Sequence, residues 1–266
     1  MADYIRRSGV SSVDRARFDE KVVIVTGSAS GLGRAIALTF ASQGAKIALA
    51  DINEEGNLVT LELVKKAGGQ AIAISTNVAD RASVDELVRE TVTRLGYVDI
   101  AVNNAGVEQP PGFFLDLEED VFDRVIAINL RGVFLCMQAE IRAMLPRNKG
   151  VIVNVTSITD EIGAAGNPAY VASKHGALGL TRSLALEFAK SGIRINAVSP
   201  GGMRTAMYES VERLHPDLIA RGLALHPIGR IADLQEVVNA VLFLASDDAS
   251  FILGHSLKVD GGYTAA

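Results

Sequence analysis

The feature that most constrains the fold of this chain is a regular alternation of short apolar segments with longer helical patterns. Seven short segments rich in β-branched residues are typical of strands buried on both faces. They cover residues 21–26, 46–50, 71–75, 98–102, 151–155, 193–198 and 256–259. Helical patterns lie between them, at about 32–43, 54–67, 82–95, 118–145, 168–190 and 233–246. This order predicts an α/β fold with one parallel sheet of about seven strands and helices on both faces.

Polar residues and glycines mark the ends of several predicted helices. Residues with capping side chains precede helices at Ser30, Asn53, Asn167 and Asp233. Glycines that can end a helix follow at Gly44, Gly68, Gly96 and Gly192. Because ligands of such sheets bind where strands end and the strand order reverses, we expect the functional site just after the strands.

The length and composition indicate a single domain. The chain has 266 residues, and α/β folds often run to about 250 residues as one unit. It is 48% hydrophobic, with 25 glycines and only 7 prolines, so it can bury roughly 70–75% of its unfolded surface around one core. We therefore expect a polar N-terminal arm at residues 1–19 and one domain at residues 20–266.

Charge and cysteine content argue against several function classes. The chain carries 26 basic and 31 acidic residues, a net charge of −5, without the basic cluster that a nucleic acid requires. The single cysteine, Cys136, fits a reducing compartment and excludes a Cys-rich metal site, and the 4 histidines lack metal-ligand spacing. No run of about 18 apolar residues or signal-peptide pattern is present. We expect a cytoplasmic protein that binds no metal, no nucleic acid and no membrane.

A glycine-rich turn, TGSASGLG at residues 26–33, follows the first predicted strand and opens a helix. Its glycines let the chain turn tightly and let backbone N–H groups approach a diphosphate at the positive end of the helix. The spacing G-xxx-G-x-G differs from the common G-x-G-x-x-G fingerprint. The turn therefore predicts a dinucleotide site, with an ordinary strand-to-helix turn as the alternative.

Asp51 ends the second predicted strand, 24 positions after Gly27. A carboxylate there can accept hydrogen bonds from the ribose hydroxyls of adenosine, and it repels a 2′-phosphate. Neither Ser30 nor Ile52 is basic, so nothing at those positions offsets the repulsion. NAD is therefore favoured over NADP; the alternative for Asp51 is a structural cap before Asn53.

The stretch AYVASKHG, residues 169–176, places Tyr170 one helical turn before Lys174. Positions i and i+4 share a helix face, with Cβ atoms about 5–6 Å apart. A phenol with an ordinary pKa of about 10 is a poor base at neutral pH, but a neighbouring ammonium group favours the phenolate. The pair can therefore act as a base and its electrostatic partner. By itself, a solvated lysine on a helix face is the commoner outcome of this spacing.

Seven motifs, taken together, resemble the short-chain dehydrogenase/reductase family. They are TGSASGLG, NNAG at 103–106, Asn129 in INLRGVF, Ser157 in VNVTS, YVASK, PGGMRT at 200–205 and VDGG at 259–262, spanning about residues 20–263. The resemblance implies a single-domain, Rossmann-type, doubly wound parallel sheet. It also implies an NAD(P)-dependent alcohol or ketone oxidoreductase that forms a homotetramer or, less often, a dimer.

The resemblance assigns catalytic roles to four residues. Tyr170 is the general base, and Lys174 holds the nicotinamide ribose and tunes the tyrosine. Ser157, 13 positions before Tyr170, orients the carbonyl oxygen, whereas Thr156 beside it should point elsewhere because side chains alternate at a strand end. Asn129 would bend its helix and hold a water linked to the lysine; the alternative is an asparagine that bonds its own helix backbone.

The same resemblance outlines a cofactor groove. The expected contacts are Gly27, Ser30, Gly31, Leu32, Gly33, Asp51, Ile52, Asn77, Val78, Asn104, Ala105, Gly106, Tyr170, Lys174, Pro200, Gly201, Met203 and Thr205. Asn103 to Gly106 would line the adenosine side and steady the sheet, and Thr205 would bond the nicotinamide carboxamide. The family commonly has an aspartate where Asn77 stands, and the asparagine oxygen can still accept from the adenine amino group.

The segment from Gly202 to Arg230 interrupts the alternation and is predicted to be a mostly apolar lid over the substrate. Glu108, Gln109 and the Pro110-Pro111 pair would form the opposite wall. Such a site suits a small alicyclic or aromatic secondary alcohol, ketone or diol, and NNAGVE and INLRGVFL resemble family members that act on cyclic ketones and diols.

Two other functions remain open. A 3-oxoacyl-(acyl-carrier-protein) reductase shares all of these motifs but usually takes NADPH, against which Asp51 argues. A non-catalytic NAD-binding sensor would normally lack one of Ser157, Tyr170 and Lys174, and all three are present.

Overall fold

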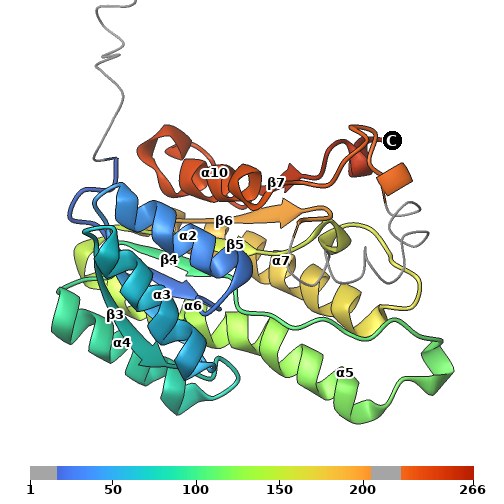
Figure 1. The fold of residues 1–266 in the computed structure, drawn as a ribbon, viewed down its shortest axis with the longest axis horizontal. Coiled ribbons are helices and arrows are strands. Elements are labelled where there is room, and N and C mark those ends of the chain that lie inside the picture. Colours follow the sequence, from blue (N-terminus) through green and yellow to red (C-terminus); the bar gives the residue numbers. More distant parts are fainter. Residues whose placement is uncertain (1–16, 205–222) are drawn as a thin grey trace, which may run out of the picture.

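Seven parallel strands form one sheet in the order β3-β2-β1-β4-β5-β6-β7 (Figure 1). The computed structural model describes residues 17–204 and 223–266. The strands are β1 Val22–Thr26, β2 Lys46–Asp51, β3 Gln70–Ser75, β4 Ile100–Asn103, β5 Gly150–Val155, β6 Ile193–Pro200 and β7 Ser256–Val259. All seven predicted segments are strands, and the strand order reverses between β1 and β4, so the carboxyl ends of these strands border a crevice.

Helices cover both faces of the sheet, as the alternation predicts (Figure 1). On one face lie α2 Gly31–Ser42, α3 Glu54–Lys66 and α10 Leu234–Ala245, and on the other α4 Arg81–Leu95, α6 Gly132–Met144 and α7 Pro168–Phe188. Each helix layer packs on the sheet through its own apolar cluster, one containing Phe40 and Val241 and the other Leu87 and Met137. The doubly wound architecture is confirmed.

The central strands are mainly apolar because both of their faces are covered, whereas the edge strands β3 and β7 are partly exposed. All five residues of β1 are buried, and so are the four inner residues of β2. Phe18 also belongs to the packed part of the chain, since its ring lies edge-on against Phe40 with centroids 4.7 Å apart. Residues 1–16 of the expected N-terminal arm lie outside the described residues.

The predicted helix at 118–145 is divided into parts. α5 Glu119–Ile126 runs into a π-helical turn, Ala127–Arg131, before α6 begins at Gly132. Asn129, in that turn, points its amide out of the helix: Oδ1 accepts from the Val107 backbone N–H at 2.8 Å and Nδ2 donates to the Val107 carbonyl at 2.9 Å. The expected bend at Asn129 is thus a π turn whose side chain bonds a neighbouring loop and not its own helix.

The capping predictions succeed at some helix ends and fail at others. Asn53 Oδ1 accepts from the Gly56 N–H at 3.0 Å, and Asp233 forms a capping box with Glu236. Ser30 and Asn167 also stand at N-cap positions, but within the described ranges their side chains make no capping hydrogen bond, so these two predictions are wrong. The four predicted helix-ending glycines all have positive φ: Gly44, Gly68, Gly96 and Gly192.

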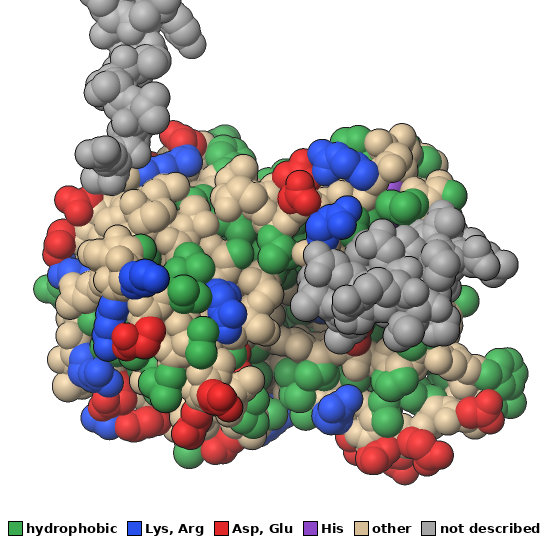
Figure 2. Space-filling model, in the orientation of Figure 1, with side chains coloured by type: hydrophobic (Ala, Val, Ile, Leu, Met, Phe, Trp, Pro, Cys, Tyr) green, Lys and Arg blue, Asp and Glu red, His purple; other side chains and the backbone are tan. Residues whose placement is uncertain are grey.

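The surface of the described residues carries mixed charge. On the face shown in Figure 2, acidic and basic side chains are interspersed, with apolar side chains among them. Across residues 17–204 and 223–266, no helix is long and apolar enough to cross a membrane. The same residues contain no group of three or more His, Cys, Asp or Glu side chains that could hold a metal ion.

Candidate active site

The glycine-rich turn lies at the carboxyl end of β1, against the residues that follow β4. Gly27 has a φ of +69°, and a Cβ atom on Gly33 would overlap the Gly27 carbonyl oxygen. Asn104 Nδ2 donates to the carbonyl oxygens of Thr26 at 3.0 Å and Gly27 at 3.2 Å. The NNAG segment therefore fixes the shape of the turn, and the side-chain amide of Asn104 serves this purpose.

Asn103 belongs to the core and not to the groove. Its side chain is 2% exposed, and Nδ2 donates to Glu140 Oε2 at 3.1 Å and Asn154 Oδ1 at 3.0 Å. The expectation that it steadies the sheet is confirmed. The expectation that it lines the adenosine side is wrong, because alternation along β4 turns it away from the site.

Asp51 joins the end of β2 to the glycine-rich turn. Its Oδ2 accepts from the Ala29 backbone N–H at 2.9 Å, and its Oδ1 accepts from the Asn53 N–H at 2.9 Å. The capping role considered as an alternative is therefore present. A carboxylate offers about four lone-pair sites, so both oxygens can still accept from a ligand hydroxyl.

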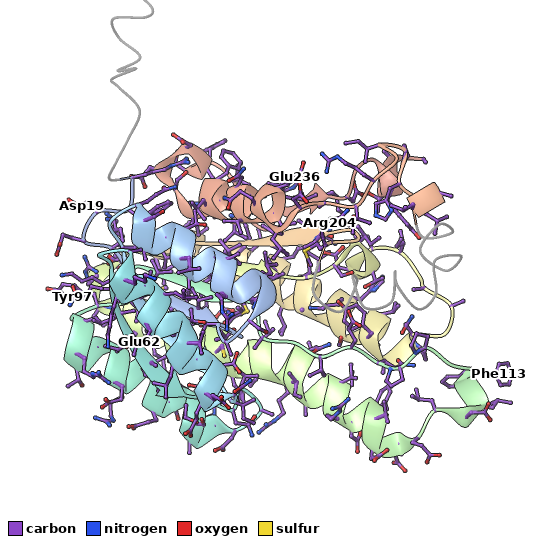
Figure 3. All side chains as sticks on the ribbon, in the orientation of Figure 1. Asp19, Glu62, Tyr97, Phe113, Arg204 and Glu236 are labelled. Atoms are coloured by element: carbon purple, nitrogen blue, oxygen red, sulfur yellow. The ribbon has the colours of Figure 1, made fainter. Side chains whose placement is uncertain are left out.

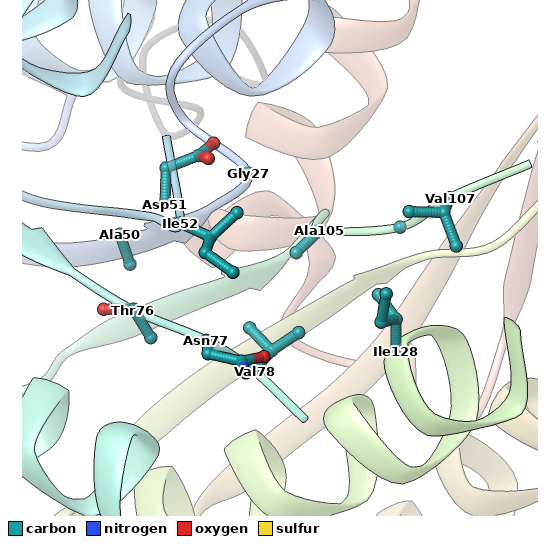
Figure 4. Close-up of a pocket in the computed structure, with 11 residues that line it drawn as sticks. Gly27, Ala50, Asp51, Ile52, Thr76, Asn77, Val78, Ala105, Val107 and Ile128 are labelled. Carbon is teal, nitrogen blue, oxygen red and sulfur yellow. The ribbon is translucent and has the colours of Figure 1, made fainter. Parts of the chain in front are cut away.

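A cleft of about 150 Å³ opens beside Asp51, between the carboxyl ends of β2, β3 and β4. In Figure 4, Asp51 and Ile52 lie on one side, with Asn77 and Val78 on another and Ala105 between them. Seven of the predicted cofactor contacts line this cleft: Gly27, Asp51, Ile52, Asn77, Val78, Ala105 and Gly106. Asn77 Oδ1 also accepts from the Ala79 N–H at 3.0 Å, which fixes its orientation.

The loop after β6 is held by a histidine that the sequence analysis did not single out. Gly201 donates its N–H to the Val259 carbonyl at 3.0 Å, and Gly202 donates its N–H to His226 Nε2 at 3.1 Å. Met203 forms an isolated parallel bridge with Ala232. Thr205 and most of the predicted lid, including Met207 and Tyr208, lie outside the described residues.

Three predicted catalytic side chains converge where β5 meets α7. Ser157 precedes the short 3-10 turn Ile158–Asp160, and its hydroxyl oxygen accepts from the Thr159 N–H at 3.2 Å; the Ser157 side chain also lowers the pKa of the neighbouring Tyr170 phenol. Lys174 Nζ lies 5.4 Å from the centre of the Tyr170 ring and donates to the Val155 carbonyl at 3.1 Å. Thr156 points away, as expected, and donates to Asp160 Oδ2 at 2.7 Å.

Burial opposes the charged forms of both members of the Tyr170–Lys174 pair. It raises the pKa of Tyr170 to about 12; the hydrogen bond with Ser157 lowers this pKa, and the charge of Glu108 raises it. Burial also lowers the pKa of Lys174 to about 8, against the charge of Asp160. Loss of hydration is the largest influence on both pKa values, and the effect of the Lys174 charge on the Tyr170 phenolate stays a prediction. At neutral pH the pair is a phenol beside an ammonium group.

Gln109, expected on the substrate wall, instead supports the start of α7. Its side chain is 4% exposed; Nε2 donates to the Gly166 carbonyl at 3.0 Å, and Oε1 accepts from the Ala169 N–H at 2.9 Å. The Ala169 N–H is one of the free donors of the first helical turn and lies one residue before Tyr170. No spacing in the sequence indicated this contact, because it joins segments 60 positions apart.

Known proteins resemble this chain over nearly its whole length. The family model described as "Enoyl-(Acyl carrier protein) reductase" matches residues 27–264. The cis-4-hydroxycyclohexanecarboxylate dehydrogenase of Sinomonas cyclohexanicum is 43% identical over 248 residues, which cover 93% of this chain and 98% of that protein. The 3-oxoacyl-[acyl-carrier-protein] reductase of Thermotoga maritima is 39% identical over 249 residues, covering 92% and 98%. The crystal structure of levodione reductase superposes with a TM-score of 0.88 at 36% identity, covering 94% of this chain and 99% of the other.

Proposed function

Because the chain belongs to the short-chain dehydrogenase/reductase family, whose members bind a nicotinamide cofactor, we propose that it interconverts a small alicyclic secondary alcohol or diol and its ketone, with NAD. It is an oxidoreductase that acts on alcohols. The observation that carries the proposal is the convergence of Ser157, Tyr170 and Lys174 beside the cleft at the carboxyl edge of the sheet. A purely NAD-binding sensor has no need of all three.

The residues around the cleft fit a dinucleotide. Gly33 leaves no room for a side chain against Gly27, whereas Gly31, with a φ of +52°, has open space where a Cβ would be. This combination suits a backbone that a diphosphate approaches closely. Asp51 would hold the adenosine ribose, Asn77 and Val78 the adenine, and Tyr170 and Lys174 the nicotinamide ribose. When bound, the nicotinamide supplies the hydride acceptor or donor.

The preference for NAD rests on charge near the end of β2. Asp51 presents a carboxylate where NADP would carry its 2′-phosphate. Arg34 lies nearby in α2, but its guanidinium is engaged with Thr60 Oγ1 at 2.9 Å and with the carbonyl oxygens of Ala29 and Gly56. It is therefore not free to neutralise an additional phosphate.

The proton chemistry belongs to the protein's own side chains. Ser157 donates a hydrogen bond to the substrate oxygen and holds it next to the Tyr170 phenol. In the direction of ketone reduction, Tyr170 gives up its proton to that oxygen; in alcohol oxidation, its phenolate removes the hydroxyl proton. Lys174, as an ammonium group one turn away, favours the phenolate electrostatically. Asn129 holds the Val107 loop and lies near the lysine, since a Cβ atom on Gly106 would stand 3.3 Å from Asn129 Oδ1 and 3.8 Å from Lys174 Nζ.

The substrate class is supported by the relatives. A dehydrogenase of a hydroxycyclohexane carboxylate and a levodione reductase are both about as long as this chain and match it throughout. The similarity to a 3-oxoacyl-[acyl-carrier-protein] reductase keeps that activity as the second candidate. The proposal also includes a homotetramer in the cytoplasm and a lid at residues 202–230; light scattering of the purified protein tests the tetramer.

The test compares cofactors and substrates on the purified enzyme. We expect oxidation of cyclohexanol and cyclohexane-1,2-diol with NAD, at a kcat/KM roughly 100-fold above that with NADP, which is about 3 kcal/mol of discrimination. The Asp51→Ser variant should reduce this preference at least about 10-fold, because the ribose acceptor and the repelling charge are both removed. Rapid NADPH-dependent reduction of 3-oxoacyl thioesters, with no turnover of cyclic alcohols, would establish the second candidate instead.

A further inference from the structure

A buried carboxylate next to Ser157 has no part in the function proposed above. Asp160 ends the 3-10 turn that follows Ser157, and its side chain is fully buried. The carboxylate accepts four hydrogen bonds. The donors are Thr156 Oγ1 at 2.7 Å, Ser199 Oγ at 3.2 Å, Ser256 Oγ at 2.7 Å and Lys258 Nζ at 2.5 Å.

These donors tie the turn to three strands. Thr156 directly follows β5, Ser199 lies in β6, and Ser256 and Lys258 lie in β7. The Asp160 N–H donates to the Ser157 carbonyl at 2.8 Å, which closes the turn around its first residue. The backbone that carries Ser157 is therefore anchored through Asp160 to the far half of the sheet.

Charged side chains adjoin Asp160 and Lys258 both toward the surface and toward the candidate active site. Lys258 is 21% exposed and also lies 3.1 Å from Glu161 Oε2, and Glu161 pairs with Arg182 at 2.6 Å. On the inner side, the negative charge of Asp160 raises the pKa of Lys174, although burial dominates and lowers it overall. Among the described residues, Lys174 also faces Tyr170 on α7 itself, and Glu108 on the loop after β4 acts on Tyr170.

We propose that Asp160 and Lys258 form a positioning pair for the reaction: Asp160 anchors the turn that carries Ser157 and places a negative charge behind Tyr170 and Lys174, and the ammonium group of Lys258 partly offsets that charge. The inference rests on the proposed function, because the pair acts through Lys174 and Tyr170. Neither Asp160 nor Lys258 touches the reacting atoms.

The physical reason lies in the shared protons of Tyr170 and Lys174. After the pair has lost one proton, the remaining one resides either on the phenol or on the amine, so the two groups titrate together. Only the phenolate–ammonium arrangement can take up the proton of the substrate hydroxyl. A negative charge at Asp160 favours this arrangement, and a positive charge at Lys258 opposes it. Removing one or the other charge must therefore have opposite effects.

The test measures kcat/KM for alcohol oxidation against pH. In Asp160→Asn the pair loses its first proton more readily, so the acidic limb should move to lower pH by about half a unit or more, and the plateau should fall about 10-fold. In Lys258→Met the acidic limb should move to higher pH. The double variant should lie nearer the wild type than either single variant does, because the two charges offset one another.

Ser256→Ala is the matched control, since it removes a hydrogen bond to Asp160 but no charge. It can lower thermal stability, but its acidic limb should coincide with that of the wild type. If Asp160→Asn does not fold, the contrast between Lys258→Met and Ser256→Ala still decides the matter. Limbs that stay in place, or that move in the same direction in both charge variants, would overturn the pairing.

A second readout does not depend on turnover. Titration of lysine side chains by nitrogen NMR, with Lys174→Arg identifying the signal, should give a lower pKa for Lys174 in Asp160→Asn and a higher one in Lys258→Met. An unchanged Lys174 titration refutes the pair even if the enzyme is active. Correct shifts in a protein that oxidises no alcohol would instead refute the proposed function.

Discussion

Two buried carboxylates in this protein, Asp160 and Glu140, differ in the hydrogen-bond donors that surround them. Asp160, at the carboxyl edge of the sheet, accepts four hydrogen bonds, one of them from the ammonium group of Lys258. Within residues 17–204 and 223–266, Glu140 on α6 accepts only from Asn103 Nδ2, at 3.1 Å, and burial raises its pKa to about 7. The pKa of Glu140 shows how strongly burial opposes a carboxylate charge when the neutral amide of Asn103 is its donor.

The region around Glu140 is arranged for a neutral acid. Within the part of the chain that the structure describes, Glu140 Oε1 and Asn103 Oδ1 have no hydrogen-bond partner. A proton on Oε1 would allow Glu140 to donate to the Asn103 oxygen, so that one proton satisfies both atoms. Asn154 continues the cluster by donating to Thr181 Oγ1 at 2.8 Å on α7. The cluster of Glu140, Asn103 and Asn154 thus joins α6, β4 and β5 in the core, whereas the pair of Asp160 and Lys258 lies next to the proposed catalytic residues.

The largest expected effect is a loss of turnover without a loss of stability, at Tyr170. Tyr170→Phe should lower kcat by about 10³-fold, because general acid–base catalysis contributes about 10²–10⁴-fold. NAD binding and the thermal unfolding temperature should stay close to those of the wild type. Tyr97→Phe is the matched control, since Tyr97 is exposed at one end of the molecule, where its ring centre lies 4.0 Å from the Arg147 guanidinium carbon (Figure 3). Near-normal turnover by Tyr170→Phe would remove the tyrosine from the reaction.

The second effect concerns the neutral cluster. The pKa of Glu140 is about 7 in the folded protein against an ordinary 4.5, so ionising it costs about 3 kcal/mol of stability. Below about pH 4.5 the group is protonated in both states and costs nothing; stability falls as the pH rises to about 7. Glu140→Gln has no proton to lose, and its amide can donate to Asn103 Oδ1. It should raise the free energy of unfolding by about 3 kcal/mol at pH 8 and by much less at pH 5.

Chemical denaturation at both pH values measures this difference. The control is Glu62→Gln, because Glu62 is exposed and its 2.9 Å ion pair with Lys65 lies on the surface, where such pairs contribute little to stability. An equal gain at pH 5 and pH 8 would show that Glu140 is not the titrating group. A loss of stability at pH 8 would show that its charge is stabilised by the core after all.

The smallest effect concerns a buried side chain that carries no charge. Gln109→Glu keeps the bond from the Ala169 N–H but cannot donate to the Gly166 carbonyl. Since a buried neutral hydrogen bond contributes about 1 kcal/mol, kcat/KM should fall about 5-fold, and about 10-fold in Gln109→Ala. Steady-state kinetics measure both variants, and the KM for NAD should not change. If Gln109→Glu impaired turnover more than Gln109→Ala, added charge near Tyr170 and not loss of positioning would explain the result.

Much of the fold followed from local sequence patterns. Continuous apolar runs identify strands that are buried on both sides, and all seven of them form the sheet. Prediction was weaker for side-chain contacts. Ser30 and Asn167 stand at the N-cap positions that their residue types favour, but within the described residues their side chains make no capping hydrogen bond. A bend at Asn129 was expected from the resemblance to the family, but the π turn at 127–131 and the contact of Asn129 with Val107 are found only in the structure.

In the candidate site, too, some residues were predicted from the sequence and others were found only in the structure. Ser157, Tyr170 and Lys174 were predicted from the resemblance to the family, whose motifs place all three within a short stretch of the chain. Gln109 and His226 were missed as supports, since their partners lie 60 and 24 positions away. Such contacts leave no periodic signal in the chain.

The sequence by itself determined the order of the strands and helices and the glycine-rich turn, because these depend on residue type and short spacing, and its resemblance to the family supplied the candidate catalytic side chains. Only the tertiary structure decided the protonation of those side chains. The donors to Asp160 come from as many as 98 positions away, and the burial that raises the pKa of Tyr170 and lowers that of Lys174 is produced by the whole packed edge of the sheet. Charge in a protein interior depends on hydration and on every nearby donor, and folding alone brings these together.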